Sequence, residues 1–222
     1  MLLIDKILEN EELEAIREFM DGAEFVDGRL TVGELIKHRK DNEQISQTQE
    51  GVEQLNQLVI DAFSRNELFR RWVKPVRFST PIHARYHRGK KYKAHVDAAT
   101  MGGANPIRTD VSITLFLNDP HDYEGGELAI ENNGDMKPVK LAAGSAIIYP
   151  TQALHEVREV TAGTRLVTVL WAQSLIRDPH IRRTLFDLSV ATQEVTRKEA
   201  DSDEALLLQK TLHNLERHFI HS

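Results

Sequence analysis

The chain of 222 residues contains no cysteine. This absence excludes disulfide frameworks, cysteine-ligated zinc and iron–sulfur centres, and thiol nucleophiles. Any metal ion must therefore be bound by nitrogen and oxygen atoms. Long apolar runs are also missing: no stretch approaches the roughly 18 residues that a membrane-spanning helix needs, so we expect no membrane segment.

A surplus of basic residues is absent as well. Lysine and arginine number 28 against 34 acidic residues, and the pI is about 5.9. Nucleic-acid-binding domains usually carry a basic surface, so we expect no nucleic-acid partner. The segment Met1 to Asn10 lacks the basic start of an export signal and contains acidic residues where the signal would be apolar. We expect a cytoplasmic protein, although the lack of cysteine would also suit the periplasm.

Apolar residues make up 41% of the chain, enough for a globular core, and near the N-terminus they recur at helical spacing. Asn10 is the expected N-cap of a helix that ends near Gly22, and a second helix is expected over residues 52–63. Residues 28–47 show little periodicity and indicate a strand or a loop. We predict that residues 1–74 form a helical support layer.

From Pro75 the pattern changes to short alternating runs separated by turn signals such as Asn133-Gly134 and Ala143-Gly144. The expected strands cover residues 111–117, 127–131, 139–141, 146–149 and 165–171. Short strands joined by turns are typical of an antiparallel sandwich or jelly roll. We therefore predict an α+β protein whose jelly-roll core spans residues 75–176.

Residues 177–222 return to helical periodicity and are predicted as a C-terminal helical extension. Its apolar positions are Ile181, Leu185 and Leu188, then Leu208, Leu212, Leu215 and Phe219. The commoner use of such a stripe is to cover the core of the same chain. The alternative is docking on a second subunit, which would make the protein a homo-oligomer through its C-terminal helices.

Three residues have the chemistry of a metal site. His95 and Asp97 are two positions apart, so on an extended segment both side chains point the same way, and His155 could supply a third ligand. A His-x-Asp pair is also common as a polar surface pair. Two imidazoles and one carboxylate leave coordination positions open and point to non-haem Fe(II) rather than zinc.

Arg165 follows ten residues after His155 and shares one strand face with Val167, Val169 and Trp171. That face is apolar, and burying an unpaired guanidinium is costly. Arg165 therefore needs a carboxylate. Either it forms a structural ion pair, or it binds the distal carboxylate of a small dicarboxylate whose other end chelates the metal, which suggests 2-oxoglutarate.

The segments around these residues carry a family resemblance. They are Tyr86 to Asp97, Arg108 to Asn118, Tyr123 to Leu128, Gly144 to Pro150, and His155 with Arg165. Together they resemble the prolyl 4-hydroxylase branch of the Fe(II)/2-oxoglutarate-dependent dioxygenases. Over nearly its whole length, including the segment from Trp171 to Arg177 and the helical tail, the chain is similar to the bacterial PKHD-type hydroxylases.

The resemblance implies a role for each motif residue. His95, Asp97 and His155 would bind Fe(II), and Arg165 would bind the C5 carboxylate of 2-oxoglutarate. Tyr86 would line the co-substrate pocket, or would simply pack in the core as a strand aromatic. The resemblance further implies a double-stranded β-helix with flanking helices, hydroxylation coupled to release of succinate and CO2, and L-ascorbate as a supporting cofactor.

Two positions depart from the family pattern: Arg165 stands where collagen-type relatives have lysine, and Phe116 lies near a position where some relatives have a tyrosine that contacts 2-oxoglutarate. The substrate stays open between a protein prolyl residue and a small metabolite, and only the resemblance suggests a link to bacterial iron uptake. The rival functions are a non-catalytic, iron-sensing or metal-binding jelly roll and a zinc-dependent hydrolase. Neither rival needs a buried arginine after the last ligand.

Overall fold

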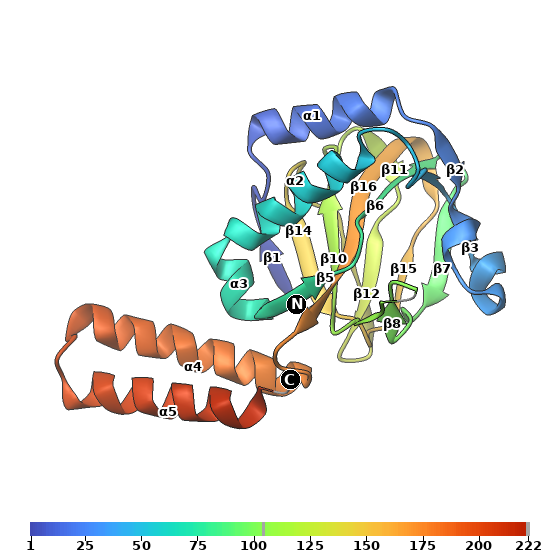
Figure 1. Ribbon diagram of the computed structural model, residues 1–222. Helices are drawn as coiled ribbons and strands as arrows, with labels where there is room; N and C mark the ends of the chain where they lie inside the picture. Colours follow the sequence, from blue (N-terminus) through green and yellow to red (C-terminus); the bar gives the residue numbers. More distant parts are fainter. Residues whose placement is uncertain (104, 221–222) are drawn as a thin grey trace.

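The computed structural model describes residues 1–103 and 105–220, in which two antiparallel sheets face each other (Figure 1). One group of apolar side chains lies between the sheets and includes Tyr86, Phe116 and Val167. A larger group lies between the nine-stranded sheet and helices α1 to α3, which cover its outer face (Figure 1). The protein is thus a mixed α and β structure, as predicted.

The larger sheet has the strand order β1-β14-β10-β16-β6-β4-β2, with β5 and β11 paired to the two ends of β16. Its strands are β1 (Leu2–Ile4), β2 (Phe25–Asp27), β4 (Glu43–Ile45), β5 (Pro75–Phe78), β6 (Ile82–His87), β10 (Val111–Phe116), β11 (Tyr123–Gly125), β14 (Ala146–Pro150) and β16 (Val160–Ser174). Along β10 and β16 alternate residues face the helices or the smaller sheet, because successive side chains of a strand point to opposite faces.

The smaller sheet has the order β13-β12-β15-β7-β3. Its strands are β3 (Lys40–Asp41), β7 (Lys91–His95), β12 (Leu128–Asn132), β13 (Asp135–Val139) and β15 (His155–Val157), and a separate hairpin pairs β8 (Thr100–Met101) with β9 (Ile107–Arg108). The strand expected over residues 139–141 was placed too late. Asn133 and Gly134 both have positive φ, as a two-residue hairpin turn requires, so the chain re-enters the sheet at Asp135.

The helices are α1 (Asn10–Asp21), α2 (Val52–Arg65), α3 (Glu67–Val73), α4 (Pro179–Lys198) and α5 (Asp203–Phe219), with short 3-10 turns η1 (Gly28–Thr31) and η2 (Glu34–Arg39). The expected N-cap at Asn10 was wrong by one residue. Glu9 has extended backbone angles and caps α1, and its N–H donates to the Glu12 carboxylate at 2.9 Å. None of the described helices is long and apolar enough to cross a membrane.

Residues 1–74 contain more than the helical layer that we predicted. Strands β1 to β4 also lie in this segment: β1, β3 and β4 pair with β14, β7 and β6 of the two sheets, and β2 pairs with β4. Short strands of two or three residues leave no recognisable alternation, which is why the sequence of residues 28–47 indicated only a strand or a loop. The division into three domains stays a prediction.

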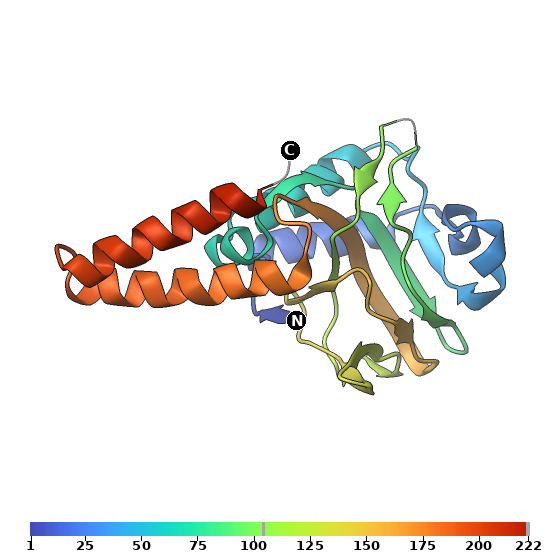
Figure 2. The ribbon, with the colours of Figure 1, turned by 90° about the horizontal axis from the view of Figure 1, so that it is seen from below.

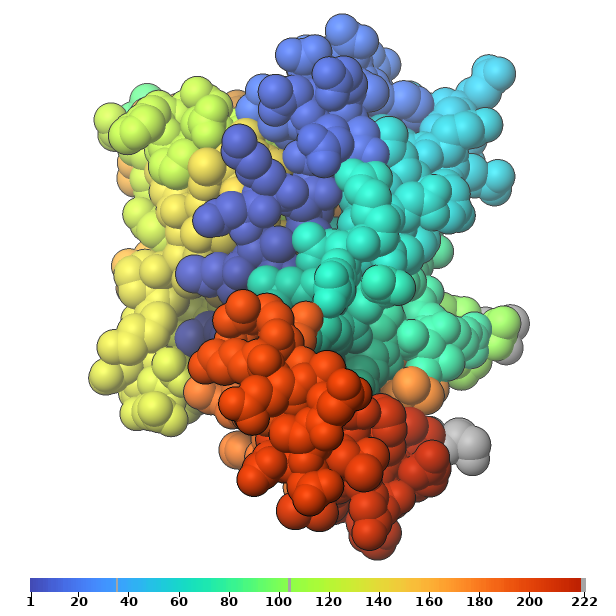
Figure 3. Space-filling view, turned by 90° about the vertical axis from the view of Figure 1, so that its left-hand side faces the viewer, coloured from blue at the N-terminus to red at the C-terminus, as the bar shows by residue number. Residues whose placement is uncertain are grey.

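The C-terminal helices form a hairpin that projects from one end of the sheets (Figure 2). In Figure 3 this hairpin, in orange and red, is seen beneath the layer of α1 to α3. Its apolar stripe packs mainly helix on helix, where Leu185 and Leu212 are buried, instead of covering the sheets as we expected. Each helix offers one stripe, and pairing the two stripes removes both from water.

Two basic side chains, the buried Arg182 and the partly buried Lys74, join the hairpin to the rest of the molecule. The Arg182 guanidinium donates to the carbonyl oxygen of Ile176 at 2.9 Å and lies 5.5 Å from the Trp72 ring centre. Lys74 forms an ion pair of 2.6 Å with Glu216 of α5. These contacts hold the base of the hairpin against the end of α3 and the segment that follows β16.

His83 of β6 is fully buried and connects the larger sheet to α2. Its Nδ1 lies 2.8 Å from the Thr168 hydroxyl and its Nε2 lies 3.0 Å from Asn56 Oδ1. Burial lowers the pKa of His83 to about 4, so the ring is neutral in the folded protein above that pH.

This pKa predicts a specific loss of stability in acid. The unfolded chain binds a proton at His83 below pH ~6.5 and the folded chain does not until about pH 4. Between these values the free energy of unfolding should fall by roughly 3 kcal/mol as the pH is lowered. The free energy of unfolding, measured with urea at several pH values in this range, should change less with pH in His83→Gln than in the wild type. An equal pH dependence in the two proteins would contradict the prediction.

Candidate active site

His95, Asp97 and His155 meet at the edge where two strands of the smaller sheet pair. His95 ends β7, His155 begins β15, and the two residues are direct partners in the antiparallel register. Asp97 follows two residues after His95, and one ligand atom from each side chain lies within 4.8 Å of the others. The structure therefore brings together the three residues that the sequence predicts as metal ligands.

The separations of the ligand atoms suit a common ion. Asp97 Oδ1 is 3.6 Å from His95 Nε2, and Asp97 Oδ2 is 3.7 Å from His155 Nε2. Atoms bonded to one metal at about 2.1 Å lie roughly 3.0 to 3.6 Å apart, so small side-chain movements would complete the coordination. All three side chains are at least nine-tenths buried.

Backbone carbonyls orient both imidazoles. Nδ1 of His95 lies 2.9 Å from the carbonyl oxygen of Lys93, and Nδ1 of His155 lies 3.1 Å from that of Ala153. An Nδ1–H that donates to a carbonyl leaves the lone pair on Nε2, the atom that faces Asp97. Burial lowers the pKa of His155, which further favours the neutral, ligating ring.

The Asp97 carboxylate is held by two donors from the larger sheet. Its Oδ2 accepts a hydrogen bond from the Ser112 hydroxyl at 2.9 Å and from the Trp171 indole N–H at 2.8 Å. Burial raises the pKa of Asp97, but the Trp171 donor and the two neighbouring imidazoles outweigh it and leave the pKa below its usual value. We had placed Trp171 on the buried face of its strand without recognising this hydrogen bond.

Arg165 lies on β16 in the larger sheet and is only 1% exposed. Its cross-strand partner is Tyr86, whose ring centre is 5.1 Å from the guanidinium carbon, and the Phe116 ring lies 5.6 Å away. No carboxylate among residues 1–103 and 105–220 forms an ion pair with Arg165, and its Nε has no hydrogen-bond partner there. The structural ion pair that we weighed for Arg165 is absent from this part of the chain.

One cavity of about 260 Å³ connects these groups. Arg165, Tyr86, His95, Asp97 and His155 all line it. An unpaired guanidinium and a three-ligand metal site on one enclosed space can together bind a dicarboxylate that reaches from the metal to the arginine. Lys40, which no sequence pattern marks as a site residue, lines the same cavity.

Paired glycines make room beside Arg165. Gly125 and Gly126 both have φ of +66°, and β11 is irregular against β16 at this point. A Cβ on Gly126 would lie 3.0 Å from the Tyr123 ring and 3.2 Å from Arg165 Cδ. A side chain here would therefore press directly on the arginine, which explains the need for glycine.

Comparison with known proteins agrees with this site. Residues 82–173 match the family model of the 2OG-Fe(II) oxygenase superfamily. A PKHD-type hydroxylase of Gloeothece citriformis is 44% identical over 96% of both chains. The chain belongs to the PKHD-type hydroxylases. A second relative of this name, from Xanthomonas campestris, is 40% identical over 98% of this chain and 97% of its own.

Solved structures share the fold of this PKHD-type hydroxylase at low sequence identity. A Pseudomonas putida prolyl-4-hydroxylase has a TM-score of 0.53 and 21% identity, and covers 78% of this chain and 91% of its own. HygX from Streptomyces hygroscopicus, solved with nickel, 2-oxoglutarate and hygromycin B, has a TM-score of 0.52 and 14% identity, with 79% and 83% covered. The protein is an Fe(II)/2-oxoglutarate-dependent dioxygenase.

Proposed function

We propose that this PKHD-type hydroxylase binds Fe(II) through His95, Asp97 and His155, and binds the C5 carboxylate of 2-oxoglutarate through Arg165. The observation that carries the proposal is the buried, unpaired guanidinium on the same cavity as the three ligand atoms. A guanidinium pairs with a carboxylate through two parallel hydrogen bonds, which suits a fixed co-substrate end. Tyr86 would line this end of the pocket.

The protein groups divide the work of the reaction. Ser112 and Trp171 hold Asp97, backbone carbonyls hold the two imidazoles, and Arg165 orients 2-oxoglutarate. When bound, Fe(II) supplies the activation of O2. In each turnover one oxygen atom would enter a substrate C–H bond as a hydroxyl, the other would enter succinate, and CO2 would leave. The apolar walls between the sheets would exclude water from these steps.

Arg165 also separates this proposal from its rivals. A non-catalytic, iron-sensing protein or a zinc-dependent hydrolase would need the three ligands but not a cation without a partner beside them. The cost of burying that cation is recovered only when an anion enters. The similarity to proteins named hydroxylases supports turnover as well.

Further parts of the proposal rest on the family and on the shape of the chain. We infer that the two sheets form a double-stranded β-helix, that L-ascorbate supports turnover, and that the protein is cytoplasmic. The exposed side chains of Leu206 and Leu207 on α5 favour a homo-oligomer through the C-terminal hairpin. A role in bacterial iron uptake is our working hypothesis for physiology.

The fold leaves two substrate classes. One structural neighbour is described as a prolyl-4-hydroxylase and another was solved with hygromycin B, so this architecture accommodates peptides and small molecules in different proteins. A shared fold does not select between them. We propose hydroxylation of an aliphatic C–H bond in either a protein prolyl residue or a metabolite.

The test is to incubate a cell extract with purified enzyme, Fe(II), 2-oxoglutarate and O2. We expect succinate to form together with one product that has gained a single oxygen atom, detected by mass spectrometry. Before O2 is admitted, Fe(II) and 2-oxoglutarate should produce a visible metal-to-ligand charge-transfer band. If no band forms, the proposed co-substrate is wrong.

A further inference from the structure

Lys40 is a second buried cation on the active-site cavity, and the proposed reaction does not use it. The residue is 7% exposed, and its Nζ donates to the Thr31 hydroxyl at 3.0 Å. The ammonium group also lies 5.4 Å from the centre of the Tyr92 ring. Asp97 and Asp27 attract it from a distance, but neither forms an ion pair with it.

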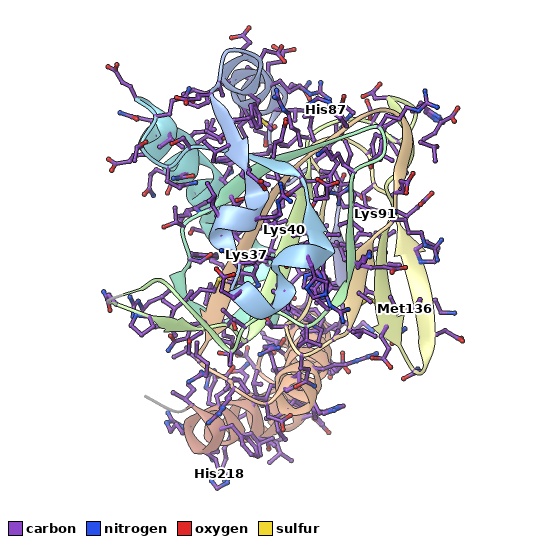
Figure 4. All side chains as sticks on the ribbon, turned by 90° about the vertical axis from the view of Figure 1, so that its right-hand side faces the viewer. Lys37, Lys40, His87, Lys91, Met136 and His218 are labelled. Atoms are coloured by element: carbon purple, nitrogen blue, oxygen red, sulfur yellow. The ribbon has the colours of Figure 1, made fainter. Side chains whose placement is uncertain are left out.

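The fold places Lys40 opposite Arg165. Lys40 lies on β3 at the edge of the smaller sheet, where it pairs with Tyr92 of β7, whereas Arg165 belongs to the larger sheet. The Tyr92 ring stacks on the His95 ring, with 3.6 Å between the ring centres, so Lys40 lies near the candidate metal ligands. Figure 4 shows the segment that carries Lys37 and Lys40 crossing in front of the strands. Thr31, Val32 and Ile36 of the same segment line the cavity.

The charges of the loaded site leave Lys40 without a partner. Fe(II), the Asp97 carboxylate, the two carboxylates of 2-oxoglutarate and the Arg165 guanidinium together are neutral. The Lys40 ammonium is then the one remaining charge on the cavity wall. Burial lowers its pKa to about 8, so at neutral pH the group is still mostly protonated. A buried charge that persists without a counter-charge is unfavourable, and an incoming anion would relieve that cost.

We propose that Lys40 binds a carboxylate of the primary substrate, which makes a carboxylate-bearing molecule the substrate class of this enzyme. This inference rests on the proposed function, because the charge count assumes that 2-oxoglutarate occupies Arg165. It favours an acidic metabolite, or a peptide with an acidic group near the oxidised carbon, over an internal prolyl residue in neutral surroundings. Lys40 is on this view a residue that determines specificity.

The test uses acetate as the simplest carboxylate probe and acetamide as its neutral counterpart. Each is titrated anaerobically into enzyme loaded with Fe(II) and 2-oxoglutarate, and thermal unfolding is followed. Acetate should stabilise the wild type and acetamide should not. In Lys40→Met the affinity for acetate should fall about tenfold or more, since one charge-assisted hydrogen bond is lost. Lys40→Gln, which can keep the contact to Thr31, should behave in the same way.

Lys37→Met is the matched control. Lys37 lies on the same segment, pairs with Glu34 and does not line the cavity, so this variant should bind acetate as the wild type does. A titration of 2-oxoglutarate, followed by the visible band, should give the same affinity in the wild type, Lys40→Met, Lys40→Gln and Lys37→Met. A weaker band in Lys40→Met would assign Lys40 to the co-substrate and overturn the inference. An equal acetate response in Lys40→Met and the wild type, or none in the wild type, would also overturn it.

A second experiment separates the sources of the carboxylate. A cell extract is divided into small molecules and proteins, and the carboxyl groups of a part of each fraction are converted to methylamides. We expect the untreated small-molecule fraction to support succinate formation and its amidated counterpart to lose this activity. Full activity of an amidated fraction would contradict the role of Lys40. Absence of the visible band in the wild type would instead contradict the proposed function.

Discussion

Asp97→Asn is expected to abolish Fe(II) binding and with it all turnover of 2-oxoglutarate. Oδ2 of Asp97 accepts from both Ser112 and Trp171. An asparagine that keeps these two bonds through its amide oxygen turns its NH2 group toward the metal, where it offers no lone pair. The flipped amide turns its oxygen toward the metal, but its NH2 group then faces the Trp171 donor, and a neutral amide oxygen is a weaker ligand than a carboxylate, so neither orientation replaces Asp97.

The expected loss of Fe(II) affinity is at least about 100-fold, because even the loss of a residue that only supports a ligand costs about 10- to 100-fold. Anaerobic Fe(II) titration by calorimetry measures it. Asp135→Asn is the control, since Asp135 is an exposed acid on β13 whose side chain is 76% accessible and should leave iron binding unchanged. Retention of Fe(II) affinity in Asp97→Asn would remove Asp97 from the ligand set.

Arg165→Met is expected to weaken 2-oxoglutarate binding by about 100- to 1,000-fold while leaving the ligand-free protein at least as stable as the wild type. Two charge-assisted hydrogen bonds to one carboxylate are worth roughly 3 to 4 kcal/mol together. In the absence of co-substrate the same guanidinium is buried beside Tyr86 and Phe116 without a counter-ion, so an apolar side chain of similar length removes a cost of folding.

Unfolding of the wild type and of Arg165→Met, without and with 2-oxoglutarate, measures both the stability of the ligand-free protein and the binding of the co-substrate. 2-Oxoglutarate at about 100 times its wild-type dissociation constant should stabilise the iron-loaded wild type by about 2.7 kcal/mol, and the variant by no more than about 0.4 kcal/mol, because the variant binds at least about 100-fold more weakly. Arg158→Met, at an exposed arginine near Glu156, should respond as the wild type does. Arg165→Lys should bind weakly, since lysine keeps the charge but not the planar fork. A stabilisation that survives in Arg165→Met would place the C5 carboxylate elsewhere.

Two of the three candidate metal ligands could be predicted from the sequence because their geometry is local. His95 and Asp97 share a side of one extended segment, and Arg165 shares its strand face with Val167, Val169 and Trp171; both relations follow from the alternation of side chains along a strand. The pairing of His155 with His95 is not local. Only the antiparallel register of β7 and β15 places these imidazoles next to each other.

Local rules failed where short segments meet. The turn at Asn133 and Gly134 was recognised, but its two-residue length, and hence the start of β13 at Asp135, depended on pairing with β12. The helical hairpin at the C-terminus was expected mainly to cover the core. An amphipathic stripe specifies that a face must be buried but not against what, and here the two helices bury their stripes against each other.

Residue identity and spacing along the chain were enough to predict the family, the co-substrate and three candidate metal ligands. Only the folded arrangement shows that Arg165 has no ion-pair partner among residues 1–103 and 105–220, and that Lys40 lines the same cavity. Residues 28–47 lack a readable pattern, so nothing local marks Lys40 as buried. Its position follows from the pairing of β3 with β7, and whether a cation lacks a partner depends on everything that the fold packs around it.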